Sequence, residues 1–306
     1  MPLPIPAPRE SGFTATTPEP LYWVRYGAAG APPLLLLHGG PGASHDYLLP
    51  QMLHLAERHD LILYDQRGGG RSRSATRAPV TWQSHVDDLG AVIAELGLGG
   101  APLRLAGYSW GALLALLYVI ASGRGGADDA GPSLSHLLLV SPAPVTRAWR
   151  DEFERALAAR SAAPAVLALR DELAASGLRE RDPEGYRQRA FELSVAGYFA
   201  DPRRARDLTP FRVLGRVQQE VWASLGDFDL VEDAAQAAAP GALVVHGRED
   251  PIPLASSEAC AAALGAPLVV LDACGHVPYV EQPAALFAAA DAFLAAPAPP
   301  PRPAAR

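Results

Sequence analysis

The stretch LRLAGYSWGALLALLYVIAS, residues 103–122, runs from a short apolar segment through Gly-Tyr-Ser-Trp-Gly into a longer apolar segment. The first segment, Leu103–Ala106, is short and mainly apolar, as a strand buried in a parallel sheet is. The second segment is long enough for a buried helix. A serine between two glycines at such a strand-to-helix turn is typical of a nucleophile elbow, whose strained backbone exposes the hydroxyl. The stretch therefore predicts a parallel sheet with flanking helices and a nucleophilic Ser109.

Short apolar runs of the same kind recur on both sides of this stretch. They cover residues 34–37, 61–64, 136–140, 243–246 and 268–272, while residues 21–26 alternate as an antiparallel strand does. Segments with helical patterns lie between them, at 49–58, 82–96 (with Thr81 as the N-cap), 256–264 and 283–294. This alternation predicts the α/β class, with a mostly parallel central sheet flanked by helices.

The pattern changes in residues 143–238, where amphipathic helical stretches follow one another without a clear strand. Three of them cover residues 147–160, 164–176 and 183–199. We therefore expect an inserted helical cap at 143–238 and a discontinuous core formed by residues 1–142 and 239–296. The Pro-rich end, residues 297–306, is expected to be a disordered tail.

Composition excludes several kinds of chemistry. All 26 basic residues are arginine, because the chain has no lysine, and this rules out a Schiff base, a Ser-Lys dyad and a Walker A loop. The net charge of −7 does not suit a nucleic-acid or anionic membrane partner. Two cysteines form no disulfide framework, and no apolar leader or membrane-spanning run is present, so we expect a cytoplasmic protein. The oligomeric state stays open.

A nucleophilic serine needs a base that takes its proton and a carboxylate that orients the base. With this type of elbow the three residues follow in the order serine, acid, histidine, and the last two lie after late strands. Asp250 follows the run 243–246, and His276 follows the run 268–272. We therefore expect Ser109, Asp250 and His276 to act together, with neither a metal nor an organic cofactor. The alternatives for the acid are Glu249, Asp227 and Asp229.

The loop HGGPGASHDYLL, residues 38–49, follows the run 34–37 and allows several interpretations. A metal site from His38, His45 and Asp46 has a spacing that matches no zinc pattern. A phosphate loop lacks both lysine and the G-x-G-x-x-G spacing, and a plain turn is a further possibility. The remaining interpretation is a loop that supplies one backbone N–H of an oxyanion hole, with the second donor being the N–H of Trp110. His38 is then expected to form hydrogen bonds within the loop.

Five motifs together resemble a known fold: HGGPG at 38–42, DQRGGGRS at 65–72, GYSWG at 107–111, GREDPIP at 247–253 and GHVPYVEQP at 275–283. They resemble the α/β-hydrolase fold, and within it the prolyl aminopeptidase (proline iminopeptidase) branch, including the tricorn-interacting aminopeptidases. The resemblance covers roughly residues 20–125 and 240–295 and is thin in the inserted segment.

The resemblance implies an exopeptidase that releases N-terminal proline, or another small or apolar residue, from short peptides. It implies that Ser109 is the nucleophile, Asp250 the acid and His276 the base. The oxyanion donors would be Gly40 and Trp110. Such aminopeptidases hold the substrate's free amine with acidic residues, one of them in the cap.

On this resemblance we expect Glu220 and Gly39 to contribute to substrate binding. Glu220 occupies a place similar to that of the cap acid, and Gly39 lies next to Gly40 in the oxyanion loop. The chain departs from the tricorn-interacting type at Pro251, where that type carries a second glutamate. It also has Ala106 directly before the GYSWG motif, at a position where the family often has a glycine.

The sequence thus leaves three functions to compare. The first is an aminopeptidase for short peptides. The second is a carboxylesterase or other small-molecule acyl hydrolase, which Pro251 makes credible. A non-enzymatic binding protein is opposed by the presence of a complete set of catalytic candidates. Dehalogenases and epoxide hydrolases of this fold place an aspartate where Ser109 stands.

Overall fold

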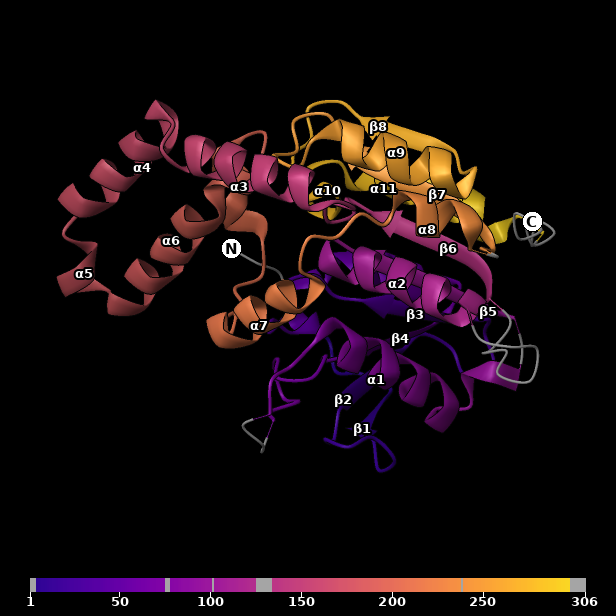
Figure 1. Ribbon diagram of the computed structural model, residues 1–306. Coiled ribbons are helices and arrows are strands. Elements are labelled where there is room, and N and C mark those ends of the chain that lie inside the picture. The colour runs from indigo at the N-terminus through magenta and orange to yellow at the C-terminus, as the bar shows by residue number, and fades with distance from the viewer. Residues whose placement is uncertain (1–3, 75–77, 101, 125–133, 238, 298–306) are drawn as a thin grey trace.

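A computed structural model describes residues 4–74, 78–100, 102–124, 134–237 and 239–297. Its eight strands form one sheet in the order β1-β2-β4-β3-β5-β6-β7-β8 (Figure 1). From β4 to β8 neighbouring strands are parallel, while β1 and β2 form an antiparallel edge. The strand bounds are β1 Glu10–Phe13, β2 Tyr22–Tyr26, β3 Pro33–Leu37, β4 Asp60–Tyr64, β5 Leu103–Tyr108, β6 Leu134–Val140, β7 Gly241–Gly247 and β8 Leu268–Leu271.

Alternate residues of each central strand face opposite layers of the core. In β3, Leu35 and Leu37 belong to one buried cluster, and Leu34 and Leu36 belong to the other. The first cluster contains α1 (Trp82–Glu95), α2 (Trp110–Arg124) and α9 (Leu254–Leu264). The second contains the 3₁₀ helix η2 (Gln51–Glu57) and α11 (Pro283–Ala295). The sheet is therefore covered on both faces, which explains why its central strands are mainly apolar.

Most of the expected elements are confirmed, and three details differ. Thr81 caps α1, because its hydroxyl accepts the N–H of Ser84. The segment expected as an α-helix at 49–58 is the 3₁₀ helix η2, which begins directly after Pro50. The helix expected at 183–199 ends at Val195 and continues as a 3₁₀ turn. β1 was not expected, because its residues Glu10–Phe13 bury no apolar face.

Between β6 and β7 the chain leaves the sheet and forms a group of helices. Figure 1 shows α4, α5 and α6 standing well away from the strands, with α3 linking them to the core. The bounds are α3 Arg147–Ser161, α4 Pro164–Ala175, α5 Leu178–Arg181, α6 Pro183–Val195, the 3₁₀ turns η5 Ala196–Tyr198 and η6 Pro202–Asp207, and then α7 Gly215–Leu225 and α8 Val231–Gln236. The remaining elements are η1 His45–Leu48, η3 Leu98–Gly100 and α10 Pro278–Glu281.

Two expectations concern the rest of the chain. The predicted tail lies, apart from residue 297, outside the described residues. Among the helices that the structure describes, none combines the length and apolarity needed to cross a bilayer.

Candidate active site

Ser109 sits at the turn between β5 and α2 with φ of 54°, in the left-handed region that few side chains adopt. The two glycines around it are required by space. A Cβ on Gly107 would lie 2.3 Å from the carbonyl oxygen of Gly111, and a Cβ on Gly111 would lie 2.2 Å from that of Leu37. The turn therefore packs directly against its own first helical turn and against β3, and this packing fixes the position of the serine.

The structure brings together the three residues expected to act on a substrate. The His276 Nε2 lies 2.9 Å from the Ser109 hydroxyl, and its Nδ1 lies 2.8 Å from a carboxylate oxygen of Asp250. The Asp250 side chain is fully buried, and its other oxygen accepts the N–H of Ile252 at 2.8 Å. An imidazole held in this way donates from Nδ1 and accepts the serine proton at Nε2, which is the geometry of an activated nucleophile.

The alternatives for the acid lie elsewhere. The Glu249 carboxylate accepts the N–H of Cys274 at 2.9 Å. Asp229 accepts the N–H of Val231 at the start of α8, and Asp227 is exposed. Of the four carboxylates considered from the sequence, Asp250 alone contacts the His276 ring.

The two expected oxyanion donors lie on either side of Ser109. Trp110 is the first residue of α2, so its N–H has no partner in the preceding turn of the helix and lies at the positive end of the helix dipole. Gly40 lines the same cavity as Ser109 and has φ of 59°. Within the described ranges, neither N–H donates a hydrogen bond to another protein group. Both donors are therefore free to bind a substrate oxygen.

Gly39 is placed differently from the expectation that it contacts substrate. Its N–H donates to the Tyr47 hydroxyl at 2.7 Å. A Cβ at this position would come within 2.8 Å of both the Ser109 Cβ and that hydroxyl. Gly39 thus allows the loop to pack against the nucleophile, and its own N–H is already used.

Gln66 connects the two oxyanion loops, and its role was not recognised from the sequence. Its side-chain oxygen accepts the indole N–H of Trp110 at 2.8 Å, and its side-chain nitrogen donates to the carbonyl of His38 at 2.7 Å. The side chain is completely buried. The only sequence signal was the position of Gln66 within the DQRGGGRS motif, which indicates a resemblance but not this contact.

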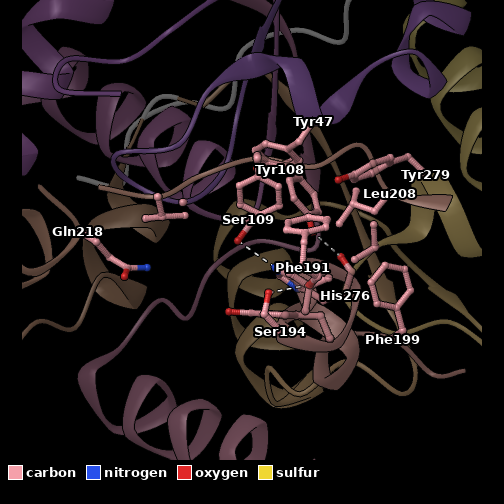
Figure 2. Close-up of a pocket in the computed structure, with 16 residues that line it drawn as sticks. Tyr47, Tyr108, Ser109, Phe191, Ser194, Phe199, Leu208, Gln218, His276 and Tyr279 are labelled. Carbon is pink, nitrogen blue, oxygen red and sulfur yellow. Dashed lines mark hydrogen bonds between the residues drawn. The ribbon is translucent and has the colours of Figure 1, made fainter. Parts of the chain in front are cut away.

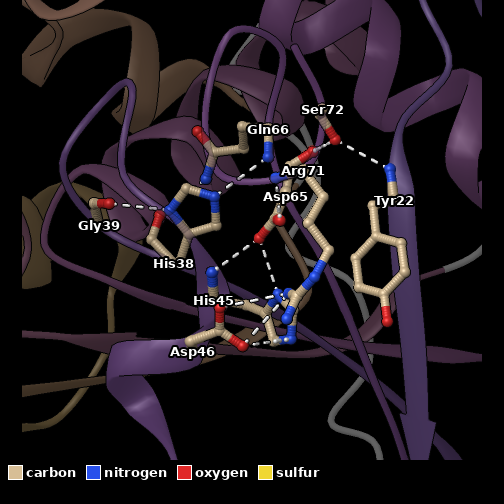
Figure 3. A network of polar contacts seen from close by, with 9 residues as sticks. All are labelled: Tyr22, His38, Gly39, His45, Asp46, Asp65, Gln66, Arg71 and Ser72. Carbon is tan, nitrogen blue, oxygen red and sulfur yellow. Dashed lines mark hydrogen bonds and ion pairs between the residues drawn. The ribbon is translucent and has the colours of Figure 1, made fainter. Parts of the chain in front are cut away.

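The two histidines of the loop 38–49 are part of the protein's own hydrogen-bond network (Figure 3). Burial lowers the pKa of His38 to about 4, so its ring is neutral and accepts the N–H of Gln66 at Nε2. The ring of His45 lies 2.7 Å from the carboxylate of Asp65, which also accepts the N–H of Arg71. The loop is therefore anchored to the DQRGGGRS segment through both histidines. The His38 Nδ1 also lies 2.8 Å from the carbonyl oxygen of Gly39, which is the contact within the loop that the sequence predicts. Among the described residues, no group of three or more His, Cys, Asp or Glu side chains could hold a metal ion.

A cavity of about 360 Å³ opens next to Ser109 and His276 (Figure 2). Its core side includes three tyrosines, Tyr47, Tyr108 and Tyr279. Its other wall comes from the segment between β6 and β7 and includes Phe191, Tyr198, Phe199 and Phe211. The polar side chains on that wall, apart from Tyr198, are Ser194 and Gln218. No carboxylate of the described residues lines the cavity.

Glu220 does not reach this cavity. It lies in α7, where one carboxylate oxygen accepts the N–H of Val80 at 3.1 Å and the other lies 2.8 Å from the Arg216 guanidinium. Gln218, two residues earlier on the same helix, lines the cavity instead. The structure therefore does not bring Glu220 to Ser109, and its position speaks against the role in amine binding expected from the sequence.

Comparisons with known proteins agree with this architecture. A model of the alpha/beta hydrolase family matches residues 34–290. Proline iminopeptidase from Levilactobacillus brevis is 37% identical over 126 residues, which cover 40% of this chain and 39% of that protein. The same enzyme from Lactobacillus delbrueckii subsp. lactis is 37% identical over 128 residues, or 40% of each chain. The chain thus spans about two fifths of the length of the curated relatives it matches.

Solved structures match over nearly the whole chain but at low identity. Proline iminopeptidase from Mycobacterium smegmatis has a TM-score of 0.65 at 21% identity, covering 93% of this chain and 97% of that one. A 2-hydroxy-6-oxo-6-phenylhexa-2,4-dienoate hydrolase from a Rhodococcus strain has a TM-score of 0.67 at 19% identity, with coverage of 94% and 99%. These likenesses show the fold.

Proposed function

Because the chain belongs to the alpha/beta hydrolase family, we propose that it is a serine hydrolase that cleaves an ester or amide bond through an acyl-enzyme at Ser109. The observation that carries this proposal is the continuous hydrogen-bonded series from Ser109 through His276 to Asp250, at the edge of a cavity. The helices that form the outer wall of the cavity belong to the segment 143–238, and we propose that this segment is the cap.

The geometry specifies the role of each group. His276 takes the proton of Ser109 as the hydroxyl oxygen attacks the substrate carbonyl, and the buried Asp250 stabilises the imidazolium that forms. The N–H groups of Gly40 and Trp110 bind the oxygen on which negative charge develops. His276 then donates the proton to the leaving group. In the second half of the reaction it activates a water that releases the acyl group from Ser109.

Two substrate classes fit this chemistry. The similarity to proline iminopeptidases supports short peptides with a free N-terminus, from which one residue would be released. The absence of a carboxylate among the described residues that line the cavity favours the second class, carboxylic esters or other small acyl compounds. Both classes pass through the same acyl-enzyme, so they differ in what the cavity accepts.

A substrate panel separates the two classes. It contains aminoacyl 4-nitroanilides with free and with blocked amines, beside 4-nitrophenyl esters of several acyl lengths, all assayed for kcat/KM. An aminopeptidase requires the free amine, whereas an acyl hydrolase turns over the esters and is indifferent to blocking. If no compound is hydrolysed and a fluorophosphonate does not label Ser109, the serine hydrolase proposal is wrong.

Replacement of Gln66 by leucine is expected to lower kcat by about 10- to 100-fold with little change in KM. The reason is that the two oxyanion donors lose the side chain that holds their loops together, and such donors act mainly on the transition state. Trp110→Phe removes one of the two hydrogen bonds and should produce a smaller loss. Steady-state kinetics with thermal melting of both variants checks this. A change confined to KM, or to the melting temperature alone, contradicts the positioning role.

A further inference from the structure

The composition of the cavity next to Ser109 points to the class of acyl group that it binds. We infer that this cavity takes a neutral, apolar acyl group and discriminates against one that carries an ammonium group, because no side chain of the described lining can balance a positive charge. This inference rests on the proposed function, since it concerns the same site, and it selects between the two substrate classes.

The walls that would surround the acyl group are aromatic and aliphatic. Phe191 and Phe211 pack against each other at 5.5 Å between ring centres, and Phe211 also packs against Tyr47 at 4.3 Å. Figure 2 shows Tyr108 and Phe191 among the rings gathered beside Ser109. Such walls release ordered water when an apolar group enters, and each Å² of apolar surface removed from water contributes about 25 cal/mol.

The tyrosines of the lining do not supply negative charge. Burial raises the pKa of Tyr198 to about 12, and it raises the pKa of Tyr47 and of Tyr108 further above the usual value for a phenol. The hydroxyl of Tyr108 donates to the carbonyl of His276 at 3.0 Å. All of these phenols are therefore neutral at neutral pH, and an ammonium group among them would lose its hydration without gaining an ion pair.

Asp250 and Glu220, the two acidic residues assigned to the site from the sequence, are already engaged with other groups. Asp250 is fully buried behind His276 and accepts hydrogen bonds from that ring and from the Ile252 N–H. Glu220 is held by Arg216 and by the N–H of Val80, and it does not line the cavity. Pairing with either of these carboxylates would require a cationic substrate to displace the contacts that hold it.

The polar residue that α7 presents to the cavity is a neutral amide, Gln218 (Figure 2). An amide can accept a hydrogen bond from a substrate, but it gives a cation far less stabilisation than a carboxylate does. Gln218 is therefore the position at which a substitution should reverse the preference for a neutral acyl group. A glutamate there differs from the native residue by one atom type and adds the missing negative charge.

The first test compares two substrates of almost the same shape. Proline 4-nitrophenyl ester and 4-nitrophenyl cyclopentanecarboxylate differ in the ring NH₂⁺, which is CH₂ in the second compound. We expect kcat/KM to be at least about tenfold higher for the cyclopentane compound at neutral pH, which corresponds to about 1.4 kcal/mol. The preference should shrink from about pH 6 to about pH 9, as the amine of the proline ester loses its proton. Equal rates, or a preference for proline, overturn the inference.

The second test installs the charge. Gln218→Glu should raise kcat/KM for the proline ester severalfold relative to the cyclopentane ester. Gln219→Glu is the matched control, because it adds the same charge at the next position of α7 but does not line the cavity. It should leave the ratio of the two substrates unchanged. If Gln218→Glu also leaves that ratio unchanged, or if both variants shift it alike, the cavity does not discriminate by charge at this wall.

Failure of the inference differs from failure of the proposed function. Labelling of Ser109 by a fluorophosphonate reports the nucleophile and does not depend on what the acyl group carries. If Ser109 is labelled but the proline ester is preferred, the inference about the acyl group is wrong and the serine hydrolase proposal still holds. If Ser109 is not labelled and no ester is hydrolysed, the serine hydrolase proposal is wrong, and the inference that rests on it is wrong as well.

Discussion

Replacement of Ser109 by alanine is expected to lower kcat by about four to six orders of magnitude, because the acyl-enzyme can no longer form. The hydroxyl oxygen lies 2.9 Å from the His276 Nε2, within hydrogen-bond distance of the ring nitrogen proposed to take its proton. Alanine occupies less space than serine and meets the same backbone strain at φ of 54°, so the fold should persist. The measurement is turnover of the best ester of the panel, together with a thermal melt.

The control for this variant is covalent labelling. The parent protein should react with a fluorophosphonate at one residue, identified by peptide mass spectrometry, and Ser109→Ala should not react. Activity of the variant within tenfold of the parent would remove Ser109 as the nucleophile, whatever the melting temperature.

Replacement of Gly111 by alanine is expected to have the largest effect on stability. The added Cβ would lie 2.2 Å from the carbonyl oxygen of Leu37 and 2.6 Å from that of His38, and both are backbone atoms in the centre of the molecule. Either β3 or α2 must then move, and overpacking against buried backbone costs about 3 kcal/mol or more of the free energy of unfolding. If Gly111→Ala yields no folded protein, that result also supports the prediction.

A second glycine provides the matched control. Gly215 begins α7, and a Cβ there meets no atom within 4 Å. Gly215→Ala should be neutral or stabilise the protein by up to about 1 kcal/mol, since it gains helix propensity without a clash. Urea denaturation of both variants gives the comparison. Equal stability of Gly111→Ala and the parent would mean that α2 does not approach β3 as closely as the structure shows.

Glu220 and Gln218 illustrate which feature of the site the sequence could not predict, namely the side chain of α7 that faces the cavity. The resemblance implies an amine-binding role for Glu220, which is one of several acidic residues in the inserted segment. Residues two apart on an α-helix point about 200° away from each other. Which of them faces Ser109 therefore depends on how α7 docks, and that is decided by its contacts with the core, such as Val217 against Gly68. No local pattern carries this information.

The sequence by itself determined the buried parallel strands, the order in which strands and helices follow along the chain, and the three residues that meet at the nucleophile. This was possible because a buried strand is recognisable from its own apolar residues. It was also possible because the carboxyl ends of parallel strands lie at one edge of the sheet, so residues that follow them come close together. Only the tertiary structure decided what faces the substrate: the aromatic cavity, the buried Gln66 between the two loops, and Gln218 in place of Glu220. These features arise from packing between segments far apart in the chain, where the direction of each side chain depends on all its neighbours at once.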